Sequence, residues 1–228
     1  NANASGPGSF PQAIADAIAS PSEDVIVFAP QTDGLVLPEI DINNSGTGLI
    51  VVKGNGEGIT LIGNRVNINS GNAGGETNVE ISGISVPEIS VNSGFGSTTR
   101  ATFSNLFVTG PGDIEVNSGF DGSLTDVTFS SLVFEDGGEF GVESGGDGGS
   151  TTNVLIENST IKELADNAID IRGDGTAVTV ERSTLVNNEG GAFIYAGSLQ
   201  MENSTITTSN SPGVKQFGGT VEIGRAHV

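Results

Sequence analysis

Three charged residues, Asp170, Arg172 and Asp174, alternate with other residues just after Ile169. On a strand they form a charged cluster, although the sequence does not fix their relative geometry. Acidic side chains can hold calcium and a basic side chain can abstract a proton, which is the chemistry of polysaccharide lyases. The competing interpretation is a surface ion pair. We therefore keep these three as candidates and assign no catalytic residue.

Glu157, Glu181 and Glu202 occupy the same position in three successive copies of a repeat. If the copies stack as parallel strands, neighbouring carboxylates lie about 5 Å apart and repel one another. A bound cation or sugar hydroxyls would relieve that repulsion, so the three residues are a candidate binding site, and Ca²⁺ is a possible ligand. The alternative is a solvated row of side chains with Arg182 nearby. No set of metal ligands is assigned.

Composition excludes several classes of function. The chain has 28 acidic and 8 basic residues, a net charge of -20, and no cysteine. Nucleic acid is excluded as a partner because phosphate binding needs clustered Lys and Arg. Cysteine nucleophiles, thiolate metal sites and disulfides are excluded outright. No apolar run approaches about 20 residues, so we expect no membrane insertion.

The candidate residues belong to a repeat of the form apolar, x, apolar, x, small or polar, x, x, apolar. Val154–Ile161 is the clearest copy. Successive copies are 20 to 27 residues apart, a period typical of a β-solenoid coil. They begin at Leu35, Ile59, Val79, Ala101, Val127, Val154, Val178, Leu199 and Val221.

A second alternating strand lies between the copies, so each coil has at least two strands. Ile89–Gly94 and Ile114–Gly119 are its clearest examples. The turn residues of these strands and of the preceding one are expected to form hydrogen-bonded ladders: Asn69, Asn92 and Asn117, with Ser70, Ser93 and Ser118. Gly145–Ser150 resembles half of a calcium-binding nonapeptide, but it occurs once, and Ser150 replaces the ligand Asp; it is interpreted as a flexible loop.

Each strand has one apolar face, which only stacking against equivalent coils would bury. The sequence therefore predicts an all-β fold: a right-handed, single-stranded parallel β-helix of about nine coils. Ile156, Val180 and Met201 should stack inside it, as should Val91, Val116 and Val142. An antiparallel sandwich would not require such similar strands at this period.

A short helix is predicted before the first coil, with Ser9 as N-cap and Pro11 in its first turn. Phe10, Ile14 and Ile18 fall on one face, which would cover the open end of the core. No counterpart follows the last copy. We therefore expect an uncovered apolar interior there, including Val214, Phe217 and Val221.

Two segments resemble bacterial right-handed β-helix surface proteins. Ser5–Ile14 (SGPGSFPQAI) followed by Asp24–Phe28 (DVIVF) is similar to their opening, and Asn158–Ile161 and Asn203–Ile206 (NSTI) are similar to their repeats. The resemblance implies the pectin-lyase-like fold, export, and a large parent protein that often carries a C-terminal surface anchor. It does not imply an activity, because this fold is found in both lyases and inert adhesins.

The expected organisation is an N-terminal segment with the capping helix (1–24), the β-helix (25–223) and a non-native tail (224–228). The tail breaks the repeat, and Ile223–Val228 back-translates to a common sequencing adapter, so the chain is expected to be a fragment. His227, the single histidine, therefore carries no functional argument.

These observations favour a non-catalytic, secreted or cell-surface bacterial scaffold, with a polysaccharide or cell-surface partner along its flank. The rest of its parent chain would continue from the C-terminal coil. The alternative is a polysaccharide lyase or glycoside hydrolase whose active site is incomplete here. Against an enzyme stand the lack of Trp and of a usable His.

Overall fold

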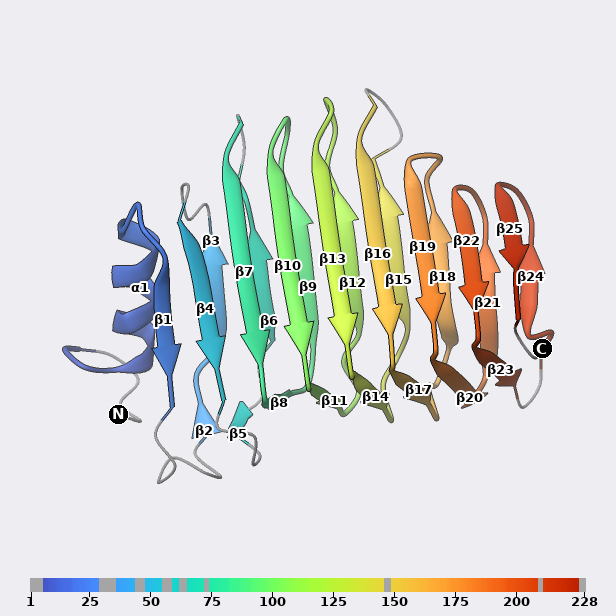
Figure 1. The fold of residues 1–228 in the computed structure, drawn as a ribbon, viewed down its shortest axis with the longest axis horizontal. Coiled ribbons are helices and arrows are strands. Elements are labelled where there is room, and N and C mark those ends of the chain that lie inside the picture. The colour runs from blue at the N-terminus through green and yellow to red at the C-terminus, as the bar shows by residue number, and fades with distance from the viewer. Residues whose placement is uncertain are drawn as a thin grey trace.

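The fold is a stack of parallel strands with one helix at its N-terminal end (Figure 1). The computed structural model describes residues 6–28, 36–43, 48–54, 59–61, 65–71, 74–145, 149–208 and 211–225. Strands of three sheets follow one another along the chain, and every pairing between strands is parallel. The predicted all-β parallel solenoid with a short N-terminal helix is confirmed.

The first sheet is the longest, and its order of strands is also their order along the chain. Its members are β1 (Asp24–Val27), β4 (Leu49–Lys53), β7 (Glu76–Ser82), β10 (Thr98–Ser104), β13 (Leu124–Ser130), β16 (Thr151–Glu157), β19 (Thr176–Glu181), β22 (Ser198–Glu202) and β25 (Thr220–Ile223).

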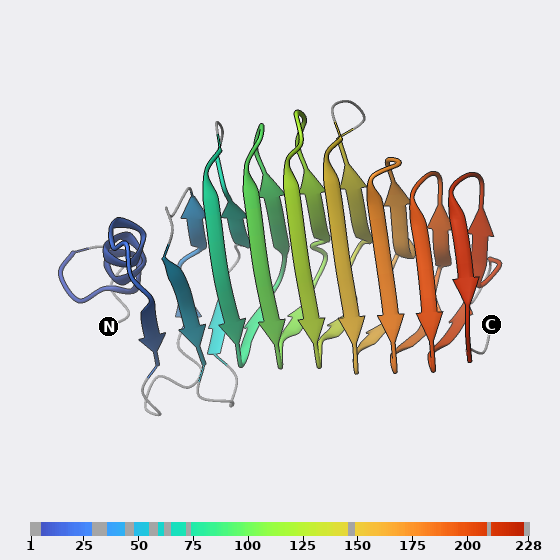
Figure 2. The same ribbon diagram turned by 45° about the horizontal axis from the view of Figure 1, so that its top comes forward.

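The second sheet is made of short strands and the third of longer ones that lie behind the first sheet (Figure 2). The second contains β2 (Val36–Leu37), β5 (Ile59–Leu61), β8 (Ile84–Val86), β11 (Phe107–Thr109), β14 (Val133–Glu135), β17 (Thr160–Lys162), β20 (Thr184–Asn188) and β23 (Thr205–Thr208). The third contains β3 (Ile40–Asn43), β6 (Val66–Asn69), β9 (Ile89–Ser93), β12 (Ile114–Ser118), β15 (Phe140–Ser144), β18 (Asn167–Arg172), β21 (Gly190–Ile194) and β24 (Val214–Gln216).

The eight-residue repeat is not one strand but two strands and the corner between them. In Val154–Ile161 the first half belongs to β16, the second half to β17, and Asn158 turns the chain at φ 51°. A residue with positive φ occupies this fifth position in each of the six described copies from Val79 onward, which favours Gly and Asn there. These corner residues are Gly83, Asn105, Ser131, Asn158, Arg182 and Asn203.

The first two predicted copies were in the wrong frame. The segments beginning at Leu35 and Ile59 contribute β2 and β5, which belong to the second sheet, and Leu35 itself lies outside the described residues. The first-sheet strands of this region are β1 and β4. Four successive apolar residues in β4, Leu49 to Val52, hide the alternation that identifies the later copies.

The number of complete coils is slightly smaller than the nine predicted. The first sheet has nine strands in the described part of the chain, whereas the second and third have eight each. Within the described ranges β25 is followed by no strand of the second or third sheet.

The core is a single column of apolar side chains between the three sheets, and both predicted stacks are confirmed. Val180 pairs in register with Ile156 and Met201, and all three are fully buried. The third-sheet valines are likewise in register and buried: Val91, Val116 and Val142.

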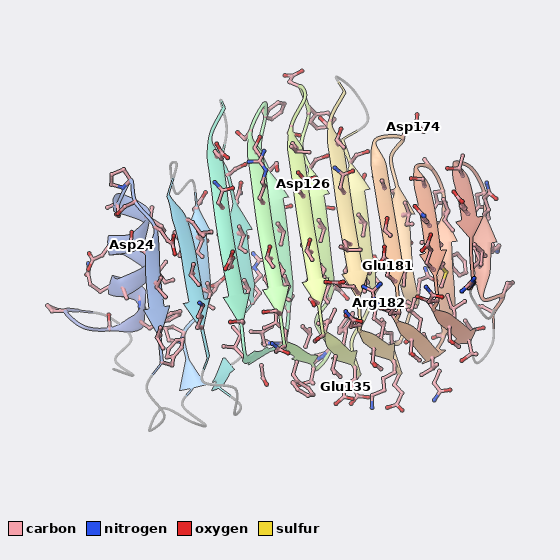
Figure 3. The ribbon with its side chains drawn as sticks, viewed as in Figure 1. Asp24, Asp126, Glu135, Asp174, Glu181 and Arg182 are labelled. Atoms are coloured by element: carbon pink, nitrogen blue, oxygen red, sulfur yellow. The ribbon has the colours of Figure 1, made fainter. Side chains whose placement is uncertain are left out.

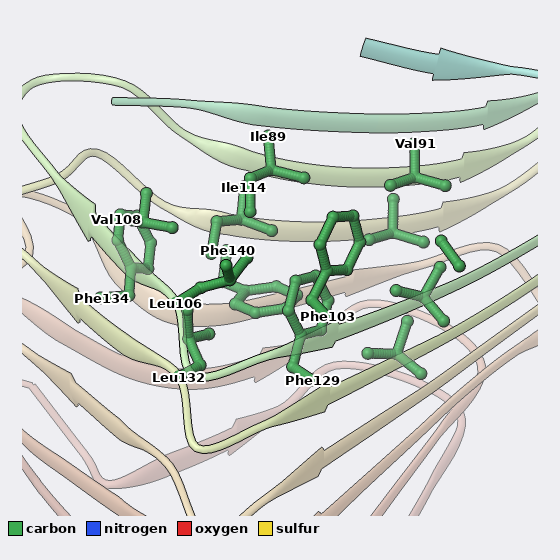
Figure 4. Packing of buried hydrophobic residues seen from close by; sticks show 14 of the residues in the cluster. Ile89, Val91, Phe103, Leu106, Val108, Ile114, Phe129, Leu132, Phe134 and Phe140 are labelled. Carbon is green, nitrogen blue, oxygen red and sulfur yellow. The ribbon is translucent and has the colours of Figure 1, made fainter. Parts of the chain in front are cut away.

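Aromatic rings fill the middle of this column (Figure 4). Phe103 and Phe129 stack with their ring centroids 4.9 Å apart, and Phe129 meets Phe140 edge to face at 5.2 Å. Such pairs add stability beyond the apolar area that they bury.

The helix α1 (Phe10–Ala19) closes the N-terminal end as predicted. Ser9 accepts a hydrogen bond from the Gln12 amide, and Phe10 and Ile14 are buried in the core cluster. The ring of Phe10 lies 5.2 Å from that of Phe28. Ile18 is only partly buried.

A buried threonine joins the third sheet to the first in four successive coils. Each hydroxyl donates to the backbone carbonyl of an outward-facing residue near the end of a third-sheet strand: Thr99 to Asn92, Thr125 to Asn117, Thr152 to Glu143 and Thr176 to Arg172. Among the described residues the expected Asn ladder consists of one bond, between Asn117 and Asn92 (3.3 Å). The expected Ser ladder is not formed: Ser93 bonds Thr125, and the buried hydroxyls of Ser70 and Ser118 have no partner.

The C-terminal end differs from the expectation in one residue. Val214 and Val221 are partly buried against the core, but Phe217 points outward and is 55% exposed. The hydrogen bond from the Gly224 amide to the Met201 carbonyl continues the ladder one residue past β25. Residues 226–228, including His227, lie outside the described residues.

Candidate functional site

Two rows of outward-facing residues run along the third sheet, and their chemistry changes along the stack. The first row begins with asparagines, becomes charged at Glu143 and Arg172, and continues with Tyr195 and Phe217, which each follow the end of a paired strand. The second row is Ser90, Glu115, Gly141, Asp170, Phe193 and Lys215. The register between the strands of the third sheet therefore places charged and aromatic side chains on adjacent coils.

Asp170 and Arg172 form an ion pair at the centre of this face. The Arg172 guanidinium donates from Nε to Asp170 Oδ1 (3.0 Å) and from its terminal nitrogen to Oδ2 (2.9 Å). Asp170 is only 2% exposed although it points away from the core. Hydrogen bonding to the Asp170 carboxylate is the main cause that raises the pKa of Arg172. A two-pronged pair of this kind fixes both side chains and keeps the guanidinium charged.

A small hollow lies beside the ion pair. It is lined by Glu115, Glu139, Glu143, Asp170 and Arg172 together with Asn117, Val142 and Gly141, which has no side chain to fill it. Its volume is about 90 Å³. Pockets that enclose whole ligands are about 300–1,000 Å³, so this one accepts a functional group rather than a sugar ring.

The hollow is a region of negative potential. Burial raises the pKa of Glu139, and the charges of Asp170, Asp166 and Asp113 raise it further, while Arg172 lowers it. Four carboxylates and one guanidinium line the hollow. A positively charged group entering it would favour the ionised form of Glu139.

An aromatic platform, defined here as Phe193, Tyr195 and Phe217, follows the ion pair on the next two coils. The Tyr195 and Phe217 rings are parallel, with centroids 4.8 Å apart, and the side chains are 45% and 55% exposed. Arg172 lies 5.7 Å from the Tyr195 ring, and Lys215 lies 4.7 Å from that of Phe217. These contacts hold the rings in place at the surface.

Asp174 does not join the cluster predicted from the sequence. It lies in the exposed turn between β18 and β19, at the top of Figure 3, and does not line the hollow. The alternation that places Asp170 and Arg172 on one face ends at Gly173, whose positive φ of 83° turns the chain.

The three glutamates of the repeat are in register, as their spacing predicts: Glu157 on β16, Glu181 on β19 and Glu202 on β22. They lie on the first sheet, whereas the hollow and the platform are on the third. Arg182 bridges the first two, at 2.7 Å from Glu157 and 2.8 Å from Glu181 (Figure 3). Gln200 donates to Glu202. Arg182 and Gln200 therefore partly relieve the repulsion between these carboxylates without any ligand. Ligand binding by the three glutamates stays a prediction.

A calcium ion also stays a prediction. In the described part of the chain, no three acidic or histidine side chains are arranged to hold a metal ion. The centre of the Gly145–Ser150 loop, residues 146–148, lies outside the described residues. No helix in the described ranges is long and apolar enough to cross a membrane.

Sequence reasoning missed Glu139, Glu143 and most of the platform. One signal was present: Tyr195-Ala196-Gly197 and Phe217-Gly218-Gly219 share the pattern aromatic, small, Gly. They occupy equivalent positions on adjacent coils, as the backbone bonds from Tyr195 to Ile171 and from Phe217 to Ile194 confirm.

A family model described as "right handed beta helix region" matches residues 66–224, more than half of the chain. The chain belongs to this family. No curated protein and no solved structure matches it. Within the right-handed β-helix family both scaffolds and enzymes are compatible with the fold, so the fold alone does not decide the function.

Proposed function

We propose that the chain is a non-catalytic β-helix scaffold that binds a polysaccharide along the outer face of its third sheet. The observation that carries the proposal is the exposed, stacked pair of Tyr195 and Phe217 on the coils next to the Asp170–Arg172 pair. Aromatic side chains provide apolar area for the C–H faces of sugars, and charged groups provide hydrogen bonds to hydroxyls.

The geometry of the face suits a polymer rather than a small ligand. The hollow and the platform are offset along the stacking direction, so one ligand must cross several coils to contact both. Because coils repeat about every 4.8 Å, a polymer that lies along the stack would meet new outward-facing side chains at each coil. The hollow is too small to hold a complete sugar ring, which leaves most of a bound polymer on the surface.

Affinity electrophoresis or calorimetry with a panel of polysaccharides tests the proposal. Tyr195→Ala and Phe217→Ala should each weaken binding about five- to tenfold, as expected when about 1 kcal/mol of apolar and stacking contact is lost. Phe107→Ala is the matched control, because Phe107 is 50% exposed but lies on the second sheet. Equal losses in all three variants would refute a site on the third sheet.

A second candidate, glycoside hydrolysis, is favoured by one observation. Glu139 has a raised pKa and lies in the hollow beside Asp170, and a carboxyl group of this kind can donate a proton to a leaving group. Incubation with neutral, amino and uronate polymers, followed by assay of reducing ends and of unsaturated products, distinguishes the two. Product formed by the parent but not by Glu139→Gln would establish the enzyme.

The proposed location is the bacterial surface or the extracellular medium. It is supported by the resemblance of Ser5–Ile14 and Asp24–Phe28 to the opening of exported β-helix proteins, and by the net charge of -20, which keeps a protein soluble. Fractionation of cells that express the full-length gene, with detection in membrane, medium and cytoplasm, tests it.

A further inference from the structure

We propose, on the basis of the glycan-binding function above, that the polymer is one of amino sugars, with an ammonium group in the hollow and a sugar ring on the platform. Two independent features lie on neighbouring coils: an exposed aromatic pair that would contact a sugar, and a cavity whose size and charge suit one small cation. Arg172 connects them, because it contacts both Asp170 and the Tyr195 ring.

The charged side chains that line the hollow favour a basic sugar over an acidic one. Within the described part of the chain Glu115, Glu139 and Glu143 form no ion pair. The guanidinium of Arg172 is already bonded to both oxygens of Asp170. A sugar carboxylate in the hollow would meet three carboxylates and an engaged arginine. The pKa of Glu139 is raised mainly by burial and then by the neighbouring carboxylates; an ammonium group would find acceptors here and relieve the repulsion among those carboxylates.

The size of the hollow determines how much of the sugar enters. A volume of about 90 Å³ admits an amino group and excludes a pyranose ring. Gly141 keeps it open: a Cβ there would lie 3.6 Å from Glu139 Oε1, so a larger side chain would occupy the space without a backbone clash. Gly141→Val therefore blocks the hollow and leaves every charge in place.

Calorimetry of the whole 228-residue chain with three hexamers tests the inference: glucosamine, N-acetylglucosamine and galacturonic acid. We expect the glucosamine hexamer to bind at least tenfold more tightly than its acetylated form, and the uronate hexamer to bind least. Glu139→Gln combined with Glu143→Gln, and separately Gly141→Val, should remove that preference. Glu80→Gln with Glu222→Gln, two exposed positions on β7 and β25, is the matched control on the first sheet and should retain it.

Because the chain is strongly acidic, attraction of any polycation must be separated from recognition. A lysine hexamer serves as the probe and should bind at least tenfold more weakly than the glucosamine hexamer. Equal binding of the two, or loss of the preference in the first-sheet control, would show charge attraction alone and overturn the inference.

The outcomes also separate this inference from the proposed function. If the acetylated or uronate hexamer binds as tightly as the glucosamine hexamer, and Tyr195→Ala weakens it, the amino-sugar inference is wrong while glycan binding stands. If no glycan binds, both fail. Thermal melting of each variant establishes that it folds before its affinity is compared.

Discussion

At the scale of single residues, inward-facing and outward-facing side chains alternate along each strand. This alternation decides which side chains form the core and which are available for binding. Ile156 points inward and is fully buried, while Leu155, its neighbour on β16, points outward and is half-buried. Asp170 is one exception to this rule, as are Val51 and Ser90. Asp170 points outward yet is almost completely covered, because Arg172 and the surrounding side chains of the hollow enclose it.

Ile156→Ala should lower the free energy of unfolding by about 2–5 kcal/mol, since it leaves a cavity in the middle of the stack. Ile156→Asp should cost more, because it buries an unpaired charge. Chemical denaturation measures both, with Leu155→Ala as the control that should cost much less. Equal losses at positions 155 and 156 would show that the strand has the opposite orientation.

Glu139→Gln should make stability less dependent on pH. The pKa of Glu139 is raised above its ordinary 4.5 in the folded state, so the folded protein binds more protons and loses stability as pH rises through that window. The variant should therefore melt at a higher temperature than the parent at pH 7, and the difference should vanish below pH 4.5. Asn117→Ala, in the same hollow, should show no such dependence, and a pH-independent gain for Glu139→Gln would contradict the assignment.

At the scale of the elements, the described coils from Val79 onward turn at a corner with positive φ, and four successive coils also have a threonine that joins the third sheet to the first. The corner was visible in the sequence as the small or polar fifth residue of the repeat. The threonines were not recognised, although Thr99, Thr125 and Thr152 each stand two residues before the inward-facing start of a copy. Their hydroxyls satisfy the carbonyls of the residues that form the outer row.

Thr152→Val should destabilise the chain by about 0.5–1.5 kcal/mol, since it keeps the shape and loses one buried hydrogen bond to the Glu143 carbonyl. Thr128→Val, at an outward position of β13, is the control and should be near neutral. Urea melts of the two variants provide the comparison. A Thr152→Val variant as stable as the parent would mean that the hydroxyl bond adds nothing.

The regularity of the strands explains how much of the fold could be predicted from the sequence. Regular alternation and a steady period identified the coils from Val79 onward, the two core stacks and the N-terminal helix. The frame failed at β4, where consecutive apolar residues remove the alternation. The hollow was not predictable, because Glu139 and Asp170 are far apart in sequence and come together only through the register between β15 and β18, which the repeat did not fix.

At the scale of the whole molecule, the two ends are unlike. The N-terminal end is covered by α1, whereas β24 and β25 are the last strands of their sheets in the described ranges, with Ile223 40% exposed. The last described coil, residues 211–225, contains Lys215, Glu222 and Arg225 as its charged residues. This coil therefore lacks the large excess of acidic over basic residues that the whole chain has.

We expect the 228-residue chain to associate through this end as ionic strength rises, because salt screens the repulsion between molecules of net charge -20. Light scattering against salt concentration, with hydrogen exchange on residues 213–223, measures it. A monomer at every salt concentration, with this coil as protected from exchange as Val127–Phe134, would show that the end is covered in another way.

The most direct test of the central claim uses the one tyrosine of a chain that has no tryptophan. Tyr195 lies on the platform, so its fluorescence reports on that surface alone. Titration with a polysaccharide shown by co-sedimentation to bind should produce a saturable change in Tyr195 emission with the same affinity, and Phe217→Ala should weaken both signals together. Binding without any change in Tyr195 emission would place the ligand elsewhere and contradict the account.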